Sequence, residues 1–242
     1  MKLLALDTAS ELCSAALWLD GELRERESLA PRAHAALILP MIDALLAEAG
    51  LALAALDAIA FGRGPGAFTG VRLAAAVAQG LGFAACRPLI AISDLRATAA
   101  QALQQAPDAD GVLVCQDARM EEVYWGCFER GVARDCAAIP VGPEAVAPVA
   151  RVALPAQWAS RVNVVGAGSG FRTYPELSRR LPDGLSLTLP HLQPRAREIA
   201  WLAAQDGMAA AIGAEDALPV YLRDRVTATP ALPGTPHGPT TP

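Results

Sequence analysis

Two aspartates, Asp7 and Asp117, end apolar stretches at corresponding points in the two halves of the chain. A carboxylate at the end of a strand can hold the magnesium ion that accompanies a bound phosphate. The glycine-rich segment 62–70, GRGPGAFTG, precedes an apolar helix, and its backbone N–H groups could bind an anion there. We therefore take Asp7, Asp117, Gly64 and Gly66 as candidate phosphate-site residues.

Both aspartate segments depart from what phosphate binding requires. A loop that wraps a phosphate usually has a glycine close to the acid, whereas these segments read DTAS at 7–10 and DAR at 117–119. This favours a fold that has kept its phosphate-binding loops but no longer carries out phosphate chemistry, with no cofactor and no catalytic residue. An ATPase or phosphotransferase that uses Asp7 and Asp117 stays open as the alternative.

Metal binding and nucleophilic catalysis find little support in the residue types. The three histidines are far apart, and no two have the i,i+4 spacing that places two imidazoles on one helical face. The five cysteines include no CxxC pair, which argues against a zinc knuckle and fits a reducing compartment. The sequence therefore predicts no metal site.

Charge and hydropathy exclude further classes of protein. Of 242 residues, 53% are hydrophobic and 19% charged, which excludes disorder of the main body. The net charge of −5 disfavours a protein that binds nucleic acid alone through many phosphate contacts. The apolar start is too short for a signal peptide, and the uncharged stretch between Arg72 and Arg87 is shorter than the roughly 20 residues that span a bilayer. We expect a cytoplasmic protein with no membrane contact.

The first half reads as three strands followed by alternating helices and strands. Asp20-Gly21 is a hairpin signal because both residues tolerate a positive φ. Gly50 should stop the first helix, and Ser93 is suited to cap the third. The expected strands are 3–7, 13–19, 22–29, 57–61 and 88–92, and the expected helices are 33–49, 71–85 and 93–105.

The second half repeats this order. A shift of 110 residues places Asp7 on Asp117, and a shift of 104 places the glycines at 62, 64 and 66 on those at 166, 168 and 170. The shared order of motifs indicates a duplication. We expect an α/β fold of two duplicated β-β-β-α-β-α halves, which is the actin-like architecture. The expected subdomains are 1–105 and 106–225, followed by a disordered proline-rich tail, 226–242.

The helices expected at 33–49 and 71–85 are apolar nearly all round. A helix on the surface of a two-layer fold should be polar opposite its core face, and these two have little polar face. Burial on both sides, by the sheet within and by partner helices without, would explain this; the alternative is that the two helices only cover each other. The expected partner-interface residues are Leu37, Met41 and Leu45 on the first helix and Leu73, Val77 and Leu81 on the second.

The segment GPGAFTGVR at 64–72 belongs to a wider pattern. It occurs together with LALDTA at 4–9, PRAH at 31–34, DAR at 117–119, EVYW at 122–125 and PVYLR at 219–223. This combination resembles the TsaB family, also called YeaZ, over all of the chain except the proline-rich tail. Position 67, often serine in that family, is Ala67 here.

The resemblance implies the actin-like (ASKHA) fold and a part in making N6-threonylcarbamoyladenosine on the adenosine next to the anticodon of tRNA. It implies a non-catalytic scaffold that binds and stabilises the paralogue TsaD through helices 33–49 and 71–85. It further implies a TsaE-like ATPase as second partner, contact with tRNA through the complex, and a homodimer when the chain is alone.

The resemblance also bears on metal chemistry. TsaD carries an HxxxH metal motif, and the corresponding residues here are Asp94 and Thr98, which make a poor metal pair. A metallopeptidase is a third alternative, which the absence of HxxxH and HExxH disfavours.

Overall fold

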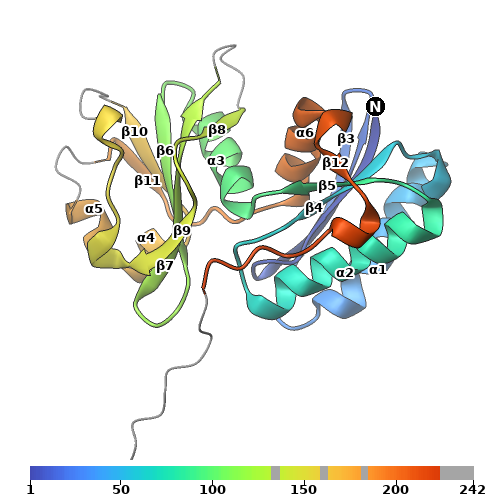
Figure 1. The fold of residues 1–242 in the computed structure, drawn as a ribbon, viewed down its shortest axis with the longest axis horizontal. Helices are drawn as coiled ribbons and strands as arrows, with labels where there is room; N and C mark the ends of the chain where they lie inside the picture. Colours follow the sequence, from blue (N-terminus) through green and yellow to red (C-terminus); the bar gives the residue numbers. More distant parts are fainter. Residues whose placement is uncertain (132–136, 159–162, 181–184, 224–242) are drawn as a thin grey trace, which may run out of the picture.

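The computed structural model describes residues 1–131, 137–158, 163–180 and 185–223. The expected disordered tail, 226–242, lies outside these residues. The described chain forms two lobes, each built on a mixed β-sheet (Figure 1).

The first sheet has the strand order β12-β5-β4-β1-β2-β3. Its central strand, β1, is antiparallel to β2 and parallel to β4, and it is buried on both faces. Its side chains alternate between two cores, with Leu4 and Leu6 on one face and Leu3 and Ala5 on the other. The strands are β1 (Lys2–Asp7), β2 (Leu12–Leu19), β3 (Glu22–Leu29), β4 (Ala58–Gly62), β5 (Leu89–Ile92) and β12 (Ala211–Ile212).

The second sheet has the order β11-β10-β6-β7-β8, with β9 paired to β7. This order matches β5-β4-β1-β2-β3 strand for strand, so the predicted duplication is confirmed in the topology. Gly64 and Gly168, which the repeat aligns, both have positive φ, of 97° and 104°. The strands are β6 (Gly111–Asp117), β7 (Glu122–Arg130), β8 (Ala138–Pro140), β9 (Ala145–Pro148), β10 (Val164–Ala167) and β11 (Leu187–Leu189).

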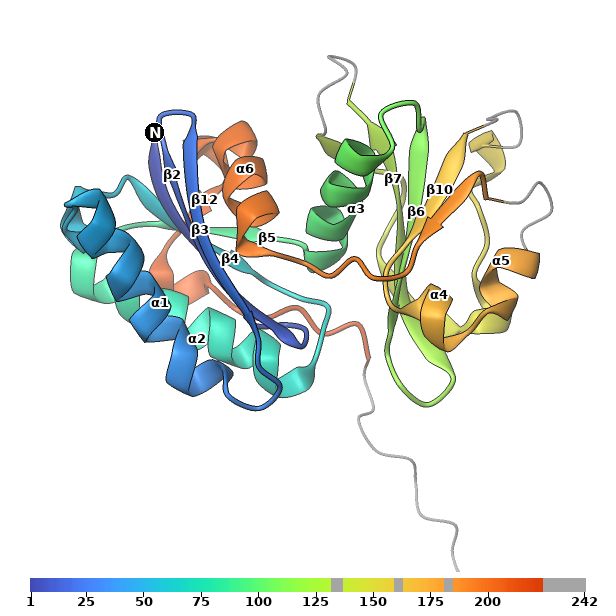
Figure 2. The same ribbon diagram turned by 180° about the vertical axis from the view of Figure 1, so that it is seen from behind.

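The helices form three layers, one on the outer side of each sheet and one between the two sheets. Two long helices pack on the outer face of the first sheet, two short ones lie on the outer side of the second, and two lie between the sheets (Figures 1 and 2). They are α1 (His34–Ala49), α2 (Phe68–Ala85), α3 (Asp94–Gln105), α4 (Gly170–Thr173), α5 (Glu176–Arg180) and α6 (Ala196–Asp206), with 3₁₀ turns η1 (Leu53–Ala55), η2 (Val149–Arg151), η3 (Ala156–Trp158), η4 (Met208–Ala210) and η5 (Ala214–Asp216).

Local signals mark several element boundaries as predicted. Asp20 and Gly21 both have positive φ in the β2–β3 hairpin. The helix α1 ends at Ala49 and is followed by Gly50 in the left-handed conformation. The Ser93 side chain accepts a hydrogen bond from the Arg96 amide as the N-cap of α3. The second half departs from the repeat between β9 and β10, where the described residues form η2 and η3 and no counterpart of α1.

The two halves of the expected division, 1–105 and 106–225, exchange helices between their sheets. The helix α3 belongs to the first half but packs on β6, β7 and β8 of the second sheet. Conversely, α6 and β12 come late in the chain and join the first sheet. The two helices contact each other between the sheets, where one continuous apolar core spans both lobes. Burial of this apolar surface therefore couples the two lobes.

The expected outward row on α1 is wrong at Leu45. Leu37 and Met41 are half-buried, but Leu45 is 1% exposed and packs in the core with Ile38 and Ile42. Positions i, i+4 and i+8 turn by about 80° around a helix of 3.6 residues per turn, so such a row drifts from the rim onto the sheet. The outer side of α1 instead carries Leu39, which is 47% exposed.

Within the described residues, α2 is the one helix with the length and apolar composition of a membrane span. Its inner side packs on β4 and β1 in the first lobe, and the helix carries Arg72 and Gln79. Packing against the sheet accounts for the buried part of its apolar surface.

Two substitutions on α1 test the assignment of its faces. Leu45→Ala should lower the free energy of unfolding by about 3 kcal/mol, because it leaves a cavity in the core. Leu39→Ala should change that free energy by no more than about 0.5 kcal/mol, since the side chain is largely in water. Urea unfolding of both variants measures the difference, and equal effects would contradict the assignment.

Candidate functional site

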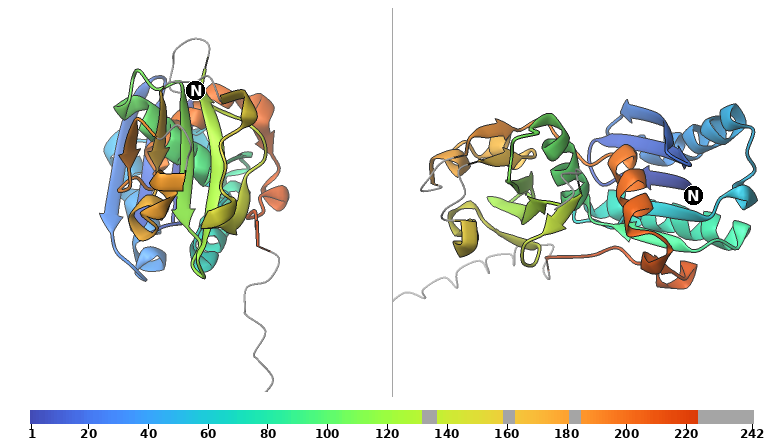
Figure 3. Two further views of the ribbon diagram at one scale, coloured as in Figure 1. Left: turned by 90° about the vertical axis from the view of Figure 1, so that its left-hand side faces the viewer. Right: turned by 90° about the horizontal axis from the view of Figure 1, so that it is seen from above.

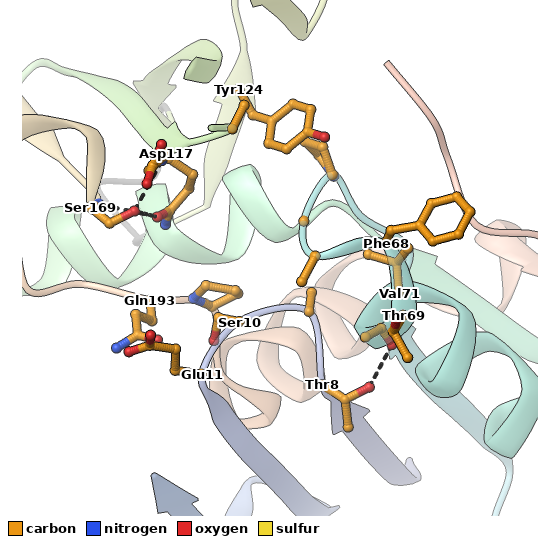
Figure 4. A pocket seen from close by; sticks show the side chains of 18 of the residues that line it. Thr8, Ser10, Glu11, Phe68, Thr69, Val71, Asp117, Tyr124, Ser169 and Gln193 are labelled. Carbon is orange, nitrogen blue, oxygen red and sulfur yellow. Dashed lines mark hydrogen bonds between the residues drawn. The ribbon is translucent and has the colours of Figure 1, made fainter. Parts of the chain in front are cut away.

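A cleft of about 860 Å³ lies between the two lobes. The first lobe contributes the β1–β2 turn, the start of α1 and the glycine-rich loop before α2. The second lobe contributes the β6–β7 turn and the start of α4 (Figure 4). Side chains from both candidate phosphate segments therefore lie near this cleft, as the predicted actin-like fold requires.

The glycine-rich loop is hydrogen-bonded to the β1–β2 turn. The Ala67 amide donates to the Ala9 carbonyl over 2.8 Å. Thr8 Oγ1 donates to the Gly70 carbonyl over 2.7 Å (Figure 4). A Cβ at Gly66 would lie 2.6 Å from the Ala9 carbonyl oxygen, and one at Gly70 would collide with the Thr8 carbonyl. Glycine is needed at both positions because the two backbones touch each other.

Gly64 is also paired within the chain. Its amide donates to the carboxyl group of Asp94, and its carbonyl accepts from the Asp94 amide over 3.1 Å. An N–H group that could bind a phosphate oxygen is therefore bonded to a buried side-chain carboxyl. A carboxyl group of the chain is therefore the acceptor of this N–H group.

Asp7 does not face the cleft. Its side chain is fully buried, and one oxygen accepts from the Ala9 amide over 3.0 Å. Burial raises the pKa of Asp7 to about 6. Burial, and next the negative charge of Asp7, raise the pKa of Asp94 well above its usual value. Asp7 is therefore placed to bind Asp94 and not a magnesium ion in the cleft.

Asp117 does line the cleft, but both of its carboxylate oxygens have partners in the chain. One oxygen accepts from the Arg119 amide over 2.8 Å and from the Tyr174 hydroxyl over 3.1 Å. The other lies 3.2 Å from the Arg119 guanidinium. Desolvation, followed by the charge of Asp117, raises the pKa of Tyr174.

The four candidate residues therefore separate into two groups. Asp7 and Gly64 meet at Asp94, with Gly66 in the same loop, whereas Asp117 lies across the cleft on the second lobe. The pairing of Asp7 with Asp94 was not predicted from the sequence. The available signal was that Asp94, like Asp7, closely follows a short apolar strand. The Gly64 and Ala67 amides and the Asp7 carboxyl group do not fit a magnesium-bound phosphate, because each is already bonded within the chain.

Asp94 and Thr98, the residues that correspond to the HxxxH histidines in the resemblance, are hydrogen-bonded within the chain. Thr98 Oγ1 donates to the Asp94 carbonyl over 2.9 Å and accepts from Gln116 Nε2 at 3.3 Å. His34 lies beside the cleft and His191 is exposed, while His237 is outside the described residues. In the part of the chain that the structure describes, no three His, Cys, Asp or Glu residues are grouped to hold a metal ion.

A C-terminal segment, residues 218–223, runs from the first lobe to the second along the cleft (Figures 1 and 3). The Val220 amide donates to the Arg63 carbonyl over 2.7 Å, and Arg223 forms an ion pair with Glu122 of the second lobe. Tyr221 accepts from Arg72 Nε at 2.6 Å, and the guanidinium of Arg72 lies 3.5 Å from the centre of the Phe68 ring. The position of this segment along the cleft was not predicted from the sequence.

The contact between the glycine-rich loop and the β1–β2 turn can be tested at Thr8. Thr8→Val should lower the free energy of unfolding by about 1–3 kcal/mol, because the isosteric change removes a hydrogen bond from a side chain that is 1% exposed. The matched change Thr69→Val, at an exposed position in the first turn of α2, should have little effect. Thermal or urea unfolding decides the point, and an unchanged Thr8→Val protein would argue against a structural role for this contact.

Comparison with known proteins agrees with this geometry. Residues 28–229 match the family model described as TsaD: tRNA N6-adenosine threonylcarbamoyltransferase. The chain is 38% identical to the tRNA threonylcarbamoyladenosine biosynthesis protein TsaB of Escherichia coli K12, over 97% of this chain and 99% of that protein. It is 40% identical to the protein of the same name from Haemophilus influenzae, over 94% and 95%.

A solved structure named YeaZ from Pseudomonas aeruginosa superposes with a TM-score of 0.82 at 44% identity, and covers 91% of this chain and 99% of that one. These matches extend over nearly the whole chain, and they confirm the resemblance that the motifs carried. The chain belongs to the TsaB (YeaZ) family of tRNA threonylcarbamoyladenosine biosynthesis proteins.

Proposed function

We propose that this chain is a non-catalytic subunit in the synthesis of threonylcarbamoyladenosine on tRNA, and that it acts by binding and stabilising TsaD. The observation that carries the proposal is the pairing of two candidate phosphate-site donors within the chain. The Gly64 amide is bonded to Asp94, and the Ala67 amide to Ala9. An ATPase or phosphotransferase would need these donors and Asp7 to be available to nucleotide and magnesium.

The second support is the outer face of the first lobe. The helices α1 and α2 cover the same face of the first sheet, on the side away from the second sheet (Figures 1 and 3). On this face Leu39 is 47% exposed and Phe83, near the end of α2, is 60% exposed. Large exposed apolar side chains on neighbouring helices are typical of a protein–protein interface.

The expected interface residues lie differently on this face. Leu37, Met41, Val77 and Leu81 are half-buried at the edge of the core and present part of their surface outward. Leu73 is also half-buried and lines the cleft. We propose that the first four form the rim of a surface centred on Leu39 and Phe83.

A TsaD-like paralogue of the same fold is the occupant we propose for this surface, because two copies of one architecture can pack equivalent helices together. A second copy of this chain would occupy it when the paralogue is absent. We further propose that a TsaE-like ATPase and tRNA join through the complex, and that the protein acts in the cytoplasm.

Leu39→Asp and Phe83→Asp test the surface. Each should weaken binding to TsaD about 30-fold or more, since an unpaired carboxylate in an interface costs about 2 kcal/mol or more. Modification of tRNA in the reconstituted system should fall in parallel. Calorimetry and a transfer assay on the same preparations provide both readouts.

Met208→Asp is the matched control, because Met208 is 48% exposed and lies in η4, beside α6 and β5 rather than on α1 or α2. It should bind and function like the wild-type chain. If the two surface variants bind TsaD normally, or if Met208→Asp binds equally poorly, the proposed surface is wrong.

The non-catalytic role has a separate test at Asp117. Asp117→Ala should keep most of the transfer activity in the assembled complex, because the proposal gives this carboxylate no contact with a reacting group. If it held magnesium or phosphate, its loss would reduce the rate by orders of magnitude. A variant that assembles normally with TsaD and is nevertheless inactive would refute the scaffold role.

A further inference from the structure

The carboxyl groups of Asp7 and Asp94 face each other at the junction of three elements. Asp7 ends β1, Asp94 begins α3, and Gly62 ends β4 between them. A Cβ at Gly62 would lie 2.5 Å from Asp7 Oδ1 and would also collide with Asp94, so only glycine leaves room for the two groups. Both aspartates are at most 1% exposed.

Each carboxyl group has one oxygen bonded to the backbone and one oxygen without such a donor. Asp7 Oδ1 accepts from the Ala9 amide, and Asp94 Oδ2 accepts from the Gly64 amide. Asp7 Oδ2 and Asp94 Oδ1 are buried and have no donor from another group. Two carboxyl groups in contact can satisfy each other only if one of them carries a proton, since two ionised groups would repel.

The other charged or titratable groups that face this pair do not neutralise it. Glu144 of the second lobe adds a further negative charge near Asp94 and forms an ion pair with Arg63, with an N···O distance of 3.3 Å. On β2, burial and the charge of Asp7 raise the pKa of the Cys13 thiol to about 11, so it stays neutral. Three carboxyl groups therefore face one guanidinium at this junction.

We propose that Asp7 and Asp94 share one proton at neutral pH, and that this O–H···O contact fastens the start of α3 to the end of β1 as a pH-sensitive joint between the lobes. The helix α3 packs on the second sheet, whereas β1 is the central strand of the first. Loss of the proton would place two negative charges in buried contact, weakening the attachment of the second lobe.

The sign of the pH dependence follows from the direction of both shifts. The pKa of Asp94 lies well above its ordinary value of 3.8, and that of Asp7 is raised to about 6. The folded chain thus keeps a proton that the unfolded chain has already released above about pH 4. The stability that this contact contributes is fully present below that pH and is lost as the pH rises through the raised values.

The isosteric variant Asp94→Asn tests the proposal, because its amide N–H replaces the shared proton and cannot be removed. Urea unfolding is measured from about pH 5 to about pH 9 for the wild type, Asp94→Asn and the control Asp108→Asn, an exposed aspartate. Relative to Asp94→Asn, the folded-to-unfolded ratio of the wild type should fall with rising pH, by up to about tenfold per pH unit. The Asp108→Asn protein should follow the wild type.

Parallel pH profiles for the wild type and Asp94→Asn would overturn the proposal. Stabilisation of the wild type, but not of Asp94→Asn, by Mg²⁺ or Ca²⁺ at pH 8 would also overturn it, because a cation would then take the place of the proton.

A second measurement needs no variant. In wild-type chain labelled with ¹³C at the aspartate side chains, the Asp94 carboxyl carbon should show the chemical shift of a protonated acid at pH 7, and the Gly64 amide should titrate with it. Ionised shifts for both Asp7 and Asp94 at pH 7 would exclude the shared proton.

Discussion

The fold around the cleft depends on one constraint, which is that every buried backbone N–H must find an acceptor. In this chain two amides of the glycine-rich loop find theirs within the protein, since Ala67 donates to Ala9 and Gly64 to Asp94. That pairing needs two backbones in contact, so it needs glycine at positions 66 and 70. It also draws Asp94 beneath the loop and against Asp7. The features that suggested a phosphate site thus serve to join the loops of the first lobe.

The same junction connects the lobes. Because α3 begins at Asp94 and packs on the second sheet, while α6 packs on the first, the two halves cannot separate without exposing the apolar core between them. The C-terminal segment adds the ion pair between Arg223 and Glu122 along the cleft. No described part of the chain is placed by these contacts on the outer face of α1 and α2. This face is the surface that we propose for the partner subunit.

Much of the fold could be predicted from local patterns, and the departures have physical causes. Hairpin, cap and apolar-run signals depend on residues close together in the sequence. The elements from β1 to α3, and the duplication, could therefore be predicted. The exchange of α3 and α6 between the sheets could not be predicted, because the apolar residues of a helix do not indicate which sheet it packs against. Leu45 was misplaced because an i,i+4 row drifts around the helix. The Asp7–Asp94 contact could not be predicted either, because the two residues are remote in sequence and only folding brings them together.

The central claim is that the Gly64 and Ala67 amides, which could bind a phosphate, are already bonded within the chain. A titration of ¹⁵N-labelled chain with MgATP, observed at the amides of Gly64 and Ala67, tests this most directly. The account predicts that neither amide resonance moves as MgATP is raised to millimolar concentration. A saturable shift of both resonances, with one nucleotide bound per chain, would show that the loop is open to phosphate and would contradict the account.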